Sequence, residues 1–526
     1  MKLSKPDRHT LILMGILILS LISGIICGFL KKGFYIDEFY SYTRANGTGI
    51  GVAVTNGEWN DTSLYLSELT AQGEELFNFD QTYANCGFHP PVYHYLLHLA
   101  SSLVPGVFTK WTGIIVNLFL SLILLLLAYR LSLKLTENNR SLSLLAVFFL
   151  EMSPALLSEI VFVRMYLCMA VFVLWYLLLH IDALESKSLS PLKFLLPLLV
   201  CGFLGFMSMY YFSLIMFPVC LFYCCHLFFI EKRIRDTFIY GITAFMSIVL
   251  SYLYLPTFVF YLKHGKGNRT ITGLAKSSGL LSRIAFFYDL VNRHVFGGLL
   301  PVFLLLLLTG CIIIFFRLRS KTDPISPSAL PVSVKGLLLC AFSSVFYYLL
   351  MVKIAPKTGD TTNRYCFACY PVFILLMVIG SYLVFRHYKN IFKKPLLSCL
   401  LLMLLTTLMC FGFGQVLFLY PQAQENIDYA KDHPDEKVVM IHMDNGQYDE
   451  EIYDLIQYPF VYFFLNTDLE KAKDPQLSSA DEILVYIDKK IENKDECFDS
   501  LLSQNEKIKE ASLLWENTSF DIYLLK

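Results

Sequence analysis

The sequence predicts a polytopic α-helical membrane protein with a small α/β domain at its C-terminal end. The first observation is composition: of 526 residues, 56% are hydrophobic and only 16% are charged, and the mean hydropathy is +0.54. Soluble domains hold about 25% charged residues, so this apolar excess is too large for a soluble core. The second observation is that apolar residues gather in long runs, and the third is an acidic C-terminal end.

Charge divides the chain into two physically different parts. Residues 420–526 contain 10 lysines, no arginine and 24 acidic residues, a balance of −14. The other residues hold 33 Lys and Arg against 19 acidic residues, a balance of +14, so the net charge of zero conceals an asymmetry. We therefore expect a transmembrane domain at residues 1–419 and an acidic, water-exposed domain at residues 420–526.

Eleven apolar runs are candidates for membrane-spanning helices, since about 20 apolar residues cross a bilayer core of roughly 30 Å. Their predicted ends are approximate to within a few residues. The runs are Thr10–Leu30, Gly113–Ala128, Leu142–Ser158, Met165–Ile181, Leu192–Ser208, Phe212–Ile230, Phe238–Tyr261, Gly298–Phe316, Gly336–Met351, Tyr370–Phe385 and Leu396–Phe418.

The distribution of basic residues predicts the orientation of these helices. With the N-terminus inside, the density of Lys and Arg is roughly threefold higher in the inner loops than in the outer loops. An odd number of helices then places the C-terminal domain outside. We expect a multi-pass protein of a bacterial plasma membrane, with its active site and its C-terminal domain extracytoplasmic.

The long loops fall on the outer face, and the inner loops have no room for a domain. The first outer loop, residues 31–110, contains the apolar stretch Val92–Leu103, which is too short to cross and predicts an interfacial or re-entrant helix. The chain has no G-x-x-x-x-G-K-S/T motif and no G-x-G-x-x-G motif after a strand. An ATP-driven pump and an enzyme using cytoplasmic nucleotide sugars are therefore disfavoured, and no feature predicts a nucleic-acid partner.

The acidic tail shows the pattern of a small α/β domain. Short apolar runs at Lys437–His442, Glu482–Asp488 and Phe520–Leu525 predict strands, and Tyr448–Leu465 and Asp495–Leu502 predict helices.

Asp37 and Glu38 form the first candidate site, in the segment Phe34-Tyr-Ile-Asp-Glu-Phe-Tyr40 just beyond the first span. Adjacent carboxylates among aromatic residues at the bilayer edge occupy a partly dehydrated position that suits a general base. The alternative is an ordinary polar loop.

His89 belongs to the second candidate site, in the segment His89-Pro-Pro-Val-Tyr-His94. Two prolines favour a helix start, and His89 would lie where unpaired N–H groups favour anions. His94 and His98 are four residues apart and could share a metal, but this spacing is also typical of an amphipathic interfacial helix.

The third candidate is Glu159-Ile-Val-Phe-Val-Arg164-Met-Tyr166, at the predicted outer turn between the third and fourth spans. Charges at that depth are costly and usually face a cavity or one another. A Glu–Arg pair with a structural role is an equal alternative.

Lys353, Arg364 and Tyr365 form the fourth candidate, between the ninth and tenth spans. Cations at an outer membrane interface can bind a lipid phosphate. The alternative is simple attraction to anionic headgroups.

The order of these motifs resembles the GT-C glycosyltransferases. The chain is similar to the glycosyltransferase family 39-like group in four motifs and in their order. The motifs are Asp-Glu after the first span, His-Pro-Pro-x-Tyr before a short apolar stretch, Arg-x-Tyr at the fourth span and Arg-Tyr before the last spans. That group includes protein O-mannosyltransferases and aminoarabinose transferases. One departure is that the aminoarabinose transferases carry a lysine before the paired prolines, where this chain has His89.

The resemblance implies an inverting hexosyl- or pentosyltransferase that acts on the outer face of the membrane. The donor would be a sugar linked to a polyprenyl phosphate, the acceptor a glycan, lipid or protein, and membrane lipid a further partner. Asp37 would be the general base, with Glu38 beside it in the catalytic set. No cofactor is required by the sequence, and a divalent cation stays open. Donor phosphate and sugar would be held by His89, Arg164, Tyr166, Lys353, Arg364 and Tyr365.

Two other functions stay open from the residues alone. A transporter or flippase for lipid or polysaccharide is expected to show inverted repeats and broken helices in matching positions, which the sequence does not display. A non-catalytic assembly protein would use the acidic tail to bind partners.

Overall fold

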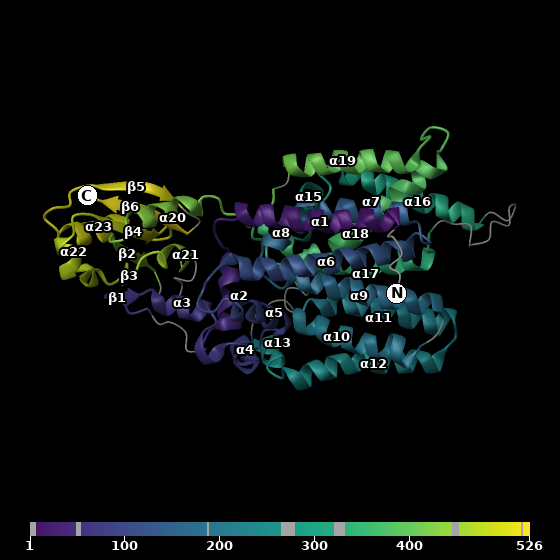
Figure 1. Ribbon diagram of the computed structural model, residues 1–526, viewed down its shortest axis with the longest axis horizontal. Helices are drawn as coiled ribbons and strands as arrows, with labels where there is room; N and C mark the ends of the chain where they lie inside the picture. Colours follow the sequence, from purple (N-terminus) through teal and green to yellow (C-terminus); the bar gives the residue numbers. More distant parts are fainter. Residues whose placement is uncertain are drawn as a thin grey trace. The chain divides into compact units, whose positions relative to one another are not determined.

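The computed structural model describes residues 7–48, 54–186, 189–264, 279–319, 332–413, 415–443, 452–516 and 519–526 (Figure 1). The chain divides into two compact units that draw on separate parts of the sequence. The helical unit comprises Met1–Gly28, Gly87–Tyr93 and Gly113–Leu417. The sheet unit comprises Phe29–Cys86, His94–Thr112 and Phe418–Lys526, so most of the first loop clusters with the C-terminal tail.

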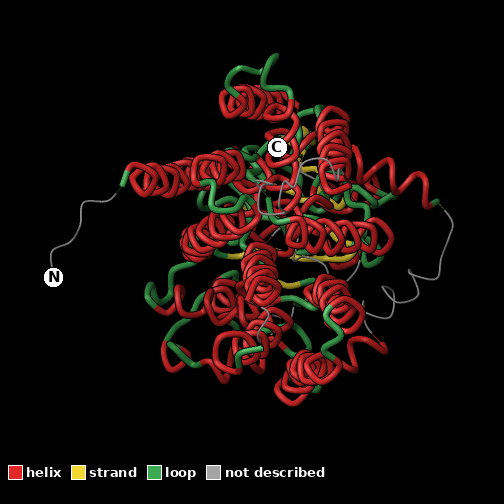
Figure 2. Tube along the Cα trace, turned by 90° about the vertical axis from the view of Figure 1, so that its right-hand side faces the viewer, coloured by secondary structure: helices red, strands yellow, loops and turns green. Residues whose placement is uncertain are grey.

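Apolar helices running roughly parallel to one another build the helical unit, and several appear end-on in Figure 2. Within the described residues, nine are long and apolar enough to cross a membrane. They are α1 (Arg8–Leu30), α6 (Lys110–Leu135), α9 (Tyr166–Ser186), Pro191–Ser208 with α10 (Leu196–Ser208), Phe212–Ile230 with α11 (Phe212–Cys225), α12 (Ile234–Tyr254), α17 (Val334–Ile354), Phe367–His387 with α18 (Tyr370–His387) and α19 (Pro395–Phe413).

Two further segments complete the set of eleven apolar runs. One is the pair α7 (Arg140–Glu151) and α8 (Pro154–Val161), which is bent by 56°. The other is α16 (Leu300–Arg319), whose apolar stretch is Leu300–Phe316. Each predicted run therefore contains helix, and the polytopic helical fold class is confirmed. By length and composition the described residues provide nine spans, or ten if the bent pair counts as one, against the eleven predicted, because the apolar stretch of α16 is shorter.

The bend between α7 and α8 corrects the expectation of one straight helix over residues 142–158. Pro154 has no N–H to donate and its ring clashes with the carbonyl four residues earlier, so the helix breaks before it. Ser153 then caps the new helix by accepting a hydrogen bond from the Ala155 N–H at 3.3 Å. The bend places Glu159 and the following turn at the end of a short buried helix.

A six-stranded sheet with the order β1-β3-β2-β4-β6-β5 forms the core of the sheet unit. Strands β3, β2 and β4 are parallel, whereas β1, β6 and β5 pair antiparallel. The strands are β1 (Glu58–Asp61), β2 (Lys437–His442), β3 (Phe460–Leu465), β4 (Ile483–Asp488), β5 (Ala511–Glu516) and β6 (Phe520–Leu525). Strand β1 comes from the first loop, and its pairing with β3 was not predicted.

Helices cover both faces of this sheet. On one face, α22 (Pro475–Ser479) and α23 (Lys494–Leu502) contribute Leu477, Cys497 and Leu501 to a buried apolar cluster. On the other face, α20 (Ala423–Asp432) and α21 (Ile452–Leu455) contribute Ala430 and Leu455. The tail is therefore an α/β domain.

All three strands predicted in the tail are confirmed as β2, β4 and β6, and the helix predicted at Asp495–Leu502 is confirmed as α23. The helix expected at Tyr448–Leu465 is wrong. Its described part contains only the short α21, and its end is strand β3. Phe460–Leu465 is a continuous apolar run, and its four central residues are buried, so it carries no alternation that distinguishes a strand from a buried helix. Residues 448–451 lie outside the described residues.

Shorter helices occupy the loops of both units. In the first loop, α5 is too short to cross a membrane, as the sequence predicts. The remaining helices are α2 (Ile36–Asn46), α3 (Ser63–Leu69), α4 (Phe79–Cys86), α5 (Val92–Ser102), α13 (Phe258–His264) and α15 (Leu280–His294).

Gly113 should be required for the packing of α6 against the turn that follows α8. A Cβ at this position would lie 2.9 Å from Val163 Cβ and would overlap the Val163 methyl groups. We expect Gly113→Ala to lower the free energy of unfolding by about 1–3 kcal/mol, the usual effect of overpacking, in denaturant titrations of the detergent-solubilised protein. Gly15→Ala is the matched control, because nothing lies within 4 Å of its added Cβ. Equal effects of the two changes would contradict this packing.

Candidate functional site

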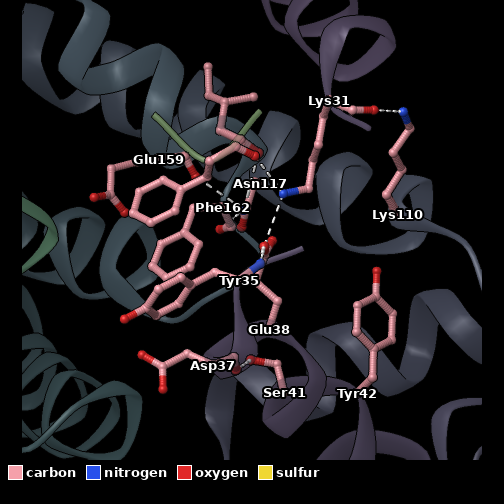
Figure 3. A network of polar contacts seen from close by, with 12 residues as sticks. Lys31, Tyr35, Asp37, Glu38, Ser41, Tyr42, Lys110, Asn117, Glu159 and Phe162 are labelled. Carbon is pink, nitrogen blue, oxygen red and sulfur yellow. Dashed lines mark hydrogen bonds and ion pairs between the residues drawn. The ribbon is translucent and has the colours of Figure 1, made fainter. Parts of the chain in front are cut away.

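A buried ion pair joins the end of α1 to the start of α2. Lys31 Nζ lies 3.0 Å from Glu38 Oε2, and both side chains are 0% exposed (Figure 3). The same Glu38 oxygen accepts the Tyr35 N–H at 2.7 Å, and Lys31 also donates to the Phe418 carbonyl at 2.8 Å. One pair of charges thus connects Lys31, the start of α2 and Phe418 within the sheet unit.

Burial affects Lys31 strongly. Removal from water lowers the pKa of the Lys31 ammonium, and the adjacent Glu38 carboxylate opposes that shift. The rings of Phe34 and Tyr420 lie 5.2 Å and 5.8 Å from Lys31 Nζ, so the ammonium also faces aromatic surface. Neither charge could stay buried at low cost without the other.

Asp37 is the second residue of α2, and its side chain is only partly buried. Figure 3 shows the Glu38 carboxylate turned toward Lys31 and the Asp37 carboxylate pointing away from that pair. A carboxylate in the first turn of a helix is favoured by the helix dipole. The two predicted catalytic acids therefore differ: Glu38 holds α2 in place, whereas Asp37 is presented by it.

The end of the first loop is attached to the same region. Lys110 donates a hydrogen bond to the Lys31 carbonyl (Figure 3). Tyr42 donates one to the Thr109 carbonyl at 2.9 Å. Both ends of the first loop are thereby fixed around α2.

In the helical unit, Arg364 lies among aromatic rings. Its side chain is 3% exposed and donates to the Thr361 carbonyl at 2.8 Å and to the Tyr365 hydroxyl at 3.3 Å. The guanidinium carbon lies 4.7 Å from the Tyr365 ring centre and 6.0 Å from that of Phe162. Tyr166 stacks on Phe162 and meets Tyr365 edge-on. We call Phe162, Tyr166, Arg364 and Tyr365 the arginine–aromatic cluster.

The turn between α8 and α9 brings two predicted sites into this cluster. Arg164 is buried in that turn, and its N–H donates to the Phe162 carbonyl at 2.7 Å. Glu159, also buried, lies close enough to Arg364 to interact with its charge. Arg164, Tyr166, Arg364 and Tyr365, predicted separately from the third and fourth candidate segments, thus belong to one neighbourhood.

Asn117 supports the same turn and was not predicted. Its side-chain amide donates to the carbonyls of Glu159, Ile160 and Phe162 at 3.2, 3.2 and 2.7 Å (Figure 3). Its oxygen accepts the Tyr93 hydroxyl at 3.2 Å. The available signal was a lone asparagine within the apolar run of α6, because such polar residues in spans usually bind other helices.

A salt bridge anchors the loop that carries Arg364. Arg293 on α15 donates to both carboxylate oxygens of Asp360, at 2.8 and 3.2 Å. Hydrogen bonding to Arg293 lowers the pKa of Asp360, so this carboxyl stays ionised over a wide pH range. Arg283 lies on the same helix, ten residues before Arg293. It donates a hydrogen bond to the Val352 carbonyl, near the end of α17, at 2.6 Å.

The other two predicted phosphate ligands lie elsewhere in the helical unit. Lys353 is in the last turn of α17, partly buried, and its side chain makes no hydrogen bond or ion pair with the described residues. His89 precedes α5 by three residues, and its ring lies 4.6 Å from that of Phe88. Asp37 and Glu38 belong to the sheet unit, so the structure groups the predicted residues into two separate sets.

The described residues do not provide an evident metal site. Over these parts of the chain, no group of three His, Cys, Asp or Glu side chains is arranged to hold an ion. His94 and His98 are both buried on α5, and His98 Nδ1 lies 3.2 Å from the Asn46 side-chain oxygen.

Comparisons with known proteins identify the fold. No protein-family profile matches the sequence, and no curated protein sequence matches it. Among solved structures, ArnT from Cupriavidus metallidurans bound to undecaprenyl phosphate matches with a TM-score of 0.53 at 9% identity, covering 97% of both chains. The Archaeoglobus fulgidus oligosaccharyltransferase in complex with zinc and sulfate matches with a TM-score of 0.50 at 12% identity, covering 97% of this chain and 72% of that one.

These likenesses show the fold of the chain. Both solved proteins are GT-C membrane proteins, and the likeness extends over nearly the whole of this chain. The GT-C-like fold that the sequence resemblance implied is therefore confirmed, including the small sheet domain at the C-terminal end.

The Lys31–Glu38 pair should be strongly coupled in stability. Glu38→Gln keeps an acceptor for the Tyr35 N–H but leaves the Lys31 charge buried alone, so we expect a loss of about 3–5 kcal/mol in unfolding free energy. The double variant Lys31→Met/Glu38→Gln should regain part of that loss, since no single charge remains buried. Denaturant titration of the solubilised protein measures both.

Asp481→Asn is the control for this pair. It breaks an exposed ion pair with Lys507, whose side chains are 85% and 59% exposed, and should cost at most about 1 kcal/mol. Strict additivity of the Lys31→Met and Glu38→Gln effects would show that the two side chains do not depend on each other.

Proposed function

We propose that this protein is a membrane glycosyltransferase that moves a sugar from a polyprenyl-phosphate donor to an acceptor. The observation that carries the proposal is the arginine–aromatic cluster, a buried guanidinium between aromatic rings at the ends of apolar helices. A planar guanidinium can bind two phosphate oxygens at once, and aromatic rings suit a sugar face or an apolar chain. The same overall fold in ArnT bound to undecaprenyl phosphate supports this assignment.

The chemistry is a single displacement at the anomeric carbon of the donor sugar. An acceptor hydroxyl forms the new C–O bond, while the bond from the anomeric carbon to the phosphate oxygen breaks. Asp37 takes the hydroxyl proton, and the polyprenyl phosphate leaves with the bonding electron pair on its phosphate oxygen. One displacement inverts the configuration at that carbon.

Arg364 stabilises the negative charge that grows on the departing phosphate. A preorganised charged donor in a dehydrated site acts most strongly where charge develops in the transition state. In this proposal Lys353 and His89 add positive charge, and Arg164, Tyr166 and Tyr365 hold the sugar or the lipid. Glu38 positions Asp37 through its bond to Lys31 and does not itself exchange a proton.

The reaction is proposed for the membrane face opposite the N-terminus. The excess of basic residues in the predicted inner loops supports an outer-face site, as does the lack of a nucleotide-binding motif. The sugar is a hexose or a pentose, and the acceptor is a glycan, a lipid or a protein of the cell surface.

Replacing Asp37 should abolish most of the turnover. Asp37→Asn keeps the size and most hydrogen bonds but cannot accept a proton, so kcat should fall about 10²–10⁴-fold while donor binding changes little. The assay uses short-chain polyprenyl-phosphate hexoses and pentoses with a membrane extract as acceptor, and measures released polyprenyl phosphate.

Asp80→Asn is the matched control for Asp37→Asn. Asp80 is likewise the second residue of a helix, α4, but its side chain is exposed. Turnover by the control should match that of the unaltered protein. A well-folded Asp37→Asn protein with normal turnover would exclude Asp37 as the base.

Arg364→Lys should impair the reaction although the charge is kept. Lysine cannot reproduce the planar two-point contact with phosphate, and Arg364→Ala should lose more, about 2–4 kcal/mol of transition-state stabilisation. The defect should fall on kcat more than on donor binding, in the same assay. Arg386→Lys, an exposed position at the other end of α18, is the control. Normal activity of Arg364→Lys together with inactive Lys353→Ala would assign the phosphate to Lys353 instead.

A further inference from the structure

A cavity opens between α1, α7 and α19 at the end of the helical unit where all three helices begin. Its volume is about 550 Å³, within the range of about 300–1,000 Å³ that is typical of ligand pockets. It is lined by Arg8, His9, Ile12, Ile16, Ser141, Leu144, Leu145, Phe148, Leu396, Leu397 and Leu400.

The walls of this cavity are apolar and face the membrane. Ile16, Leu144 and Leu145 are buried, whereas Ile12, Leu396 and Leu397 are 41%, 36% and 46% exposed. Helices α1 and α19 each bury only 28% of their spanning window inside the protein, so both lie at the periphery of the bundle. An occupant would therefore enter from the bilayer.

The polar groups of the cavity gather at one end. Arg8 and His9 belong to the first turn of α1, and His9 Nε2 lies 3.3 Å from the Ser141 hydroxyl. Arg8 makes no hydrogen bond or ion pair through its side chain with any described residue. Lys393 and Lys394, both exposed, immediately precede α19.

Two acidic residues precede the helices that line the cavity: Asp7 before α1 and Glu137 before α7. Asp7 pairs with Arg140 at the start of α7, so its charge is already compensated there. Arg8 lines the cavity, and Lys393 and Lys394 immediately precede α19, whose Leu396 and Leu397 also line it, so basic residues gather around this end. The rim is therefore complementary to an anion at headgroup level.

We propose that this cavity binds one anionic phospholipid, with an acyl chain along the apolar wall and its phosphate beside Arg8. The cavity lies at the start of α1, and this helix rises about 33 Å from Arg8 to Leu30 at 1.5 Å per residue. It is therefore distinct from the proposed transferase site, lies in the leaflet on the N-terminal side, and does not rest on the proposed activity.

A lipid bound at this position would connect three helices of the bundle. Ile12, Leu144 and Leu397 lie on three helices that are far apart in sequence, and an acyl chain would contact all three at once. A bound lipid fills space that side chains leave open, and its phosphate balances the basic rim.

Photocrosslinking tests the site directly. The purified protein is titrated with a photoactivatable phosphatidylglycerol, and the labelled peptides are mapped. Label is expected on peptides containing residues 8–16, 141–148 or 396–400. A zwitterionic phosphatidylcholine probe should label these peptides more weakly, and inorganic phosphate should not compete.

Two variants test the polar and the apolar parts separately. Arg8→Ala should weaken labelling about fivefold, the effect of one cation at a lipid surface. Leu397→Trp fills the cavity but keeps every charge and should weaken it about tenfold or more, because several buried methylene contacts are displaced. Arg235→Ala and Leu408→Trp are the controls: Arg235 is an exposed cation at the start of α12, and Leu408 is 72% exposed on α19.

The outcomes are distinct. Loss of label in both cavity variants but not in the controls, with unchanged thermal midpoints, supports the proposal. Equal labelling by both lipids, or labelling that ignores Arg8 and Leu397, overturns it. Competition by inorganic phosphate would mean a free-anion site. A dimer that Leu397→Trp dissociates would mean that a second copy of the chain occupies the cavity.

Discussion

A lysine and a glutamate that are both withdrawn from water fix the start of α2 within the sheet unit. Lys31 follows directly on the apolar helix α1, and its charge is tolerated there because Glu38, the Phe418 carbonyl and two aromatic rings surround it. Such pairs contribute little net stability compared with apolar packing, yet each charge is costly without its partner. The pair therefore fixes geometry, and the geometry it fixes is the start of α2, where Asp37 projects.

The same principle organises the arginine–aromatic cluster. Arg364 is nearly inaccessible to solvent, and its neighbours are ring faces, a hydroxyl and a main-chain carbonyl. The surrounding supports are long-range: Asn117 from α6 holds the turn before α9, and Arg293 from α15 holds the loop before Arg364. A cation held in this way has a fixed orientation, which is the physical basis for proposing it as the ligand of the donor phosphate.

Much of the helical architecture could be predicted from the sequence because apolar runs of spanning length leave few alternatives. Strands β2, β4 and β6 could also be predicted, because each is a short apolar run bounded by polar residues. Phe460–Leu465 was misassigned because an unbroken apolar run fits a buried strand and a buried helix equally well. Strand β1 could not be foreseen, since Glu58–Asp61 is polar and becomes a strand only by pairing with β3.

In the candidate site, too, some features could be predicted from the sequence and others could not. Asp37, Arg164 and Arg364 stood out because charges beside apolar runs are costly and need a reason. The contacts among these residues were not predictable: the sequence does not single out Lys31, and only the fold reveals that it pairs with Glu38. The convergence of Tyr166 with Tyr365, 199 positions further on, likewise depends on helix packing that no local pattern encodes.

The most direct measurement of the central claim is mass spectrometry of cell-surface glycans, lipids and proteins from cells that possess or lack this protein. A glycosyltransferase account predicts one sugar residue that disappears when the protein is removed and returns with the unaltered chain but not with Asp37→Asn. Identical spectra with and without the protein, or full restoration by Asp37→Asn, would contradict it.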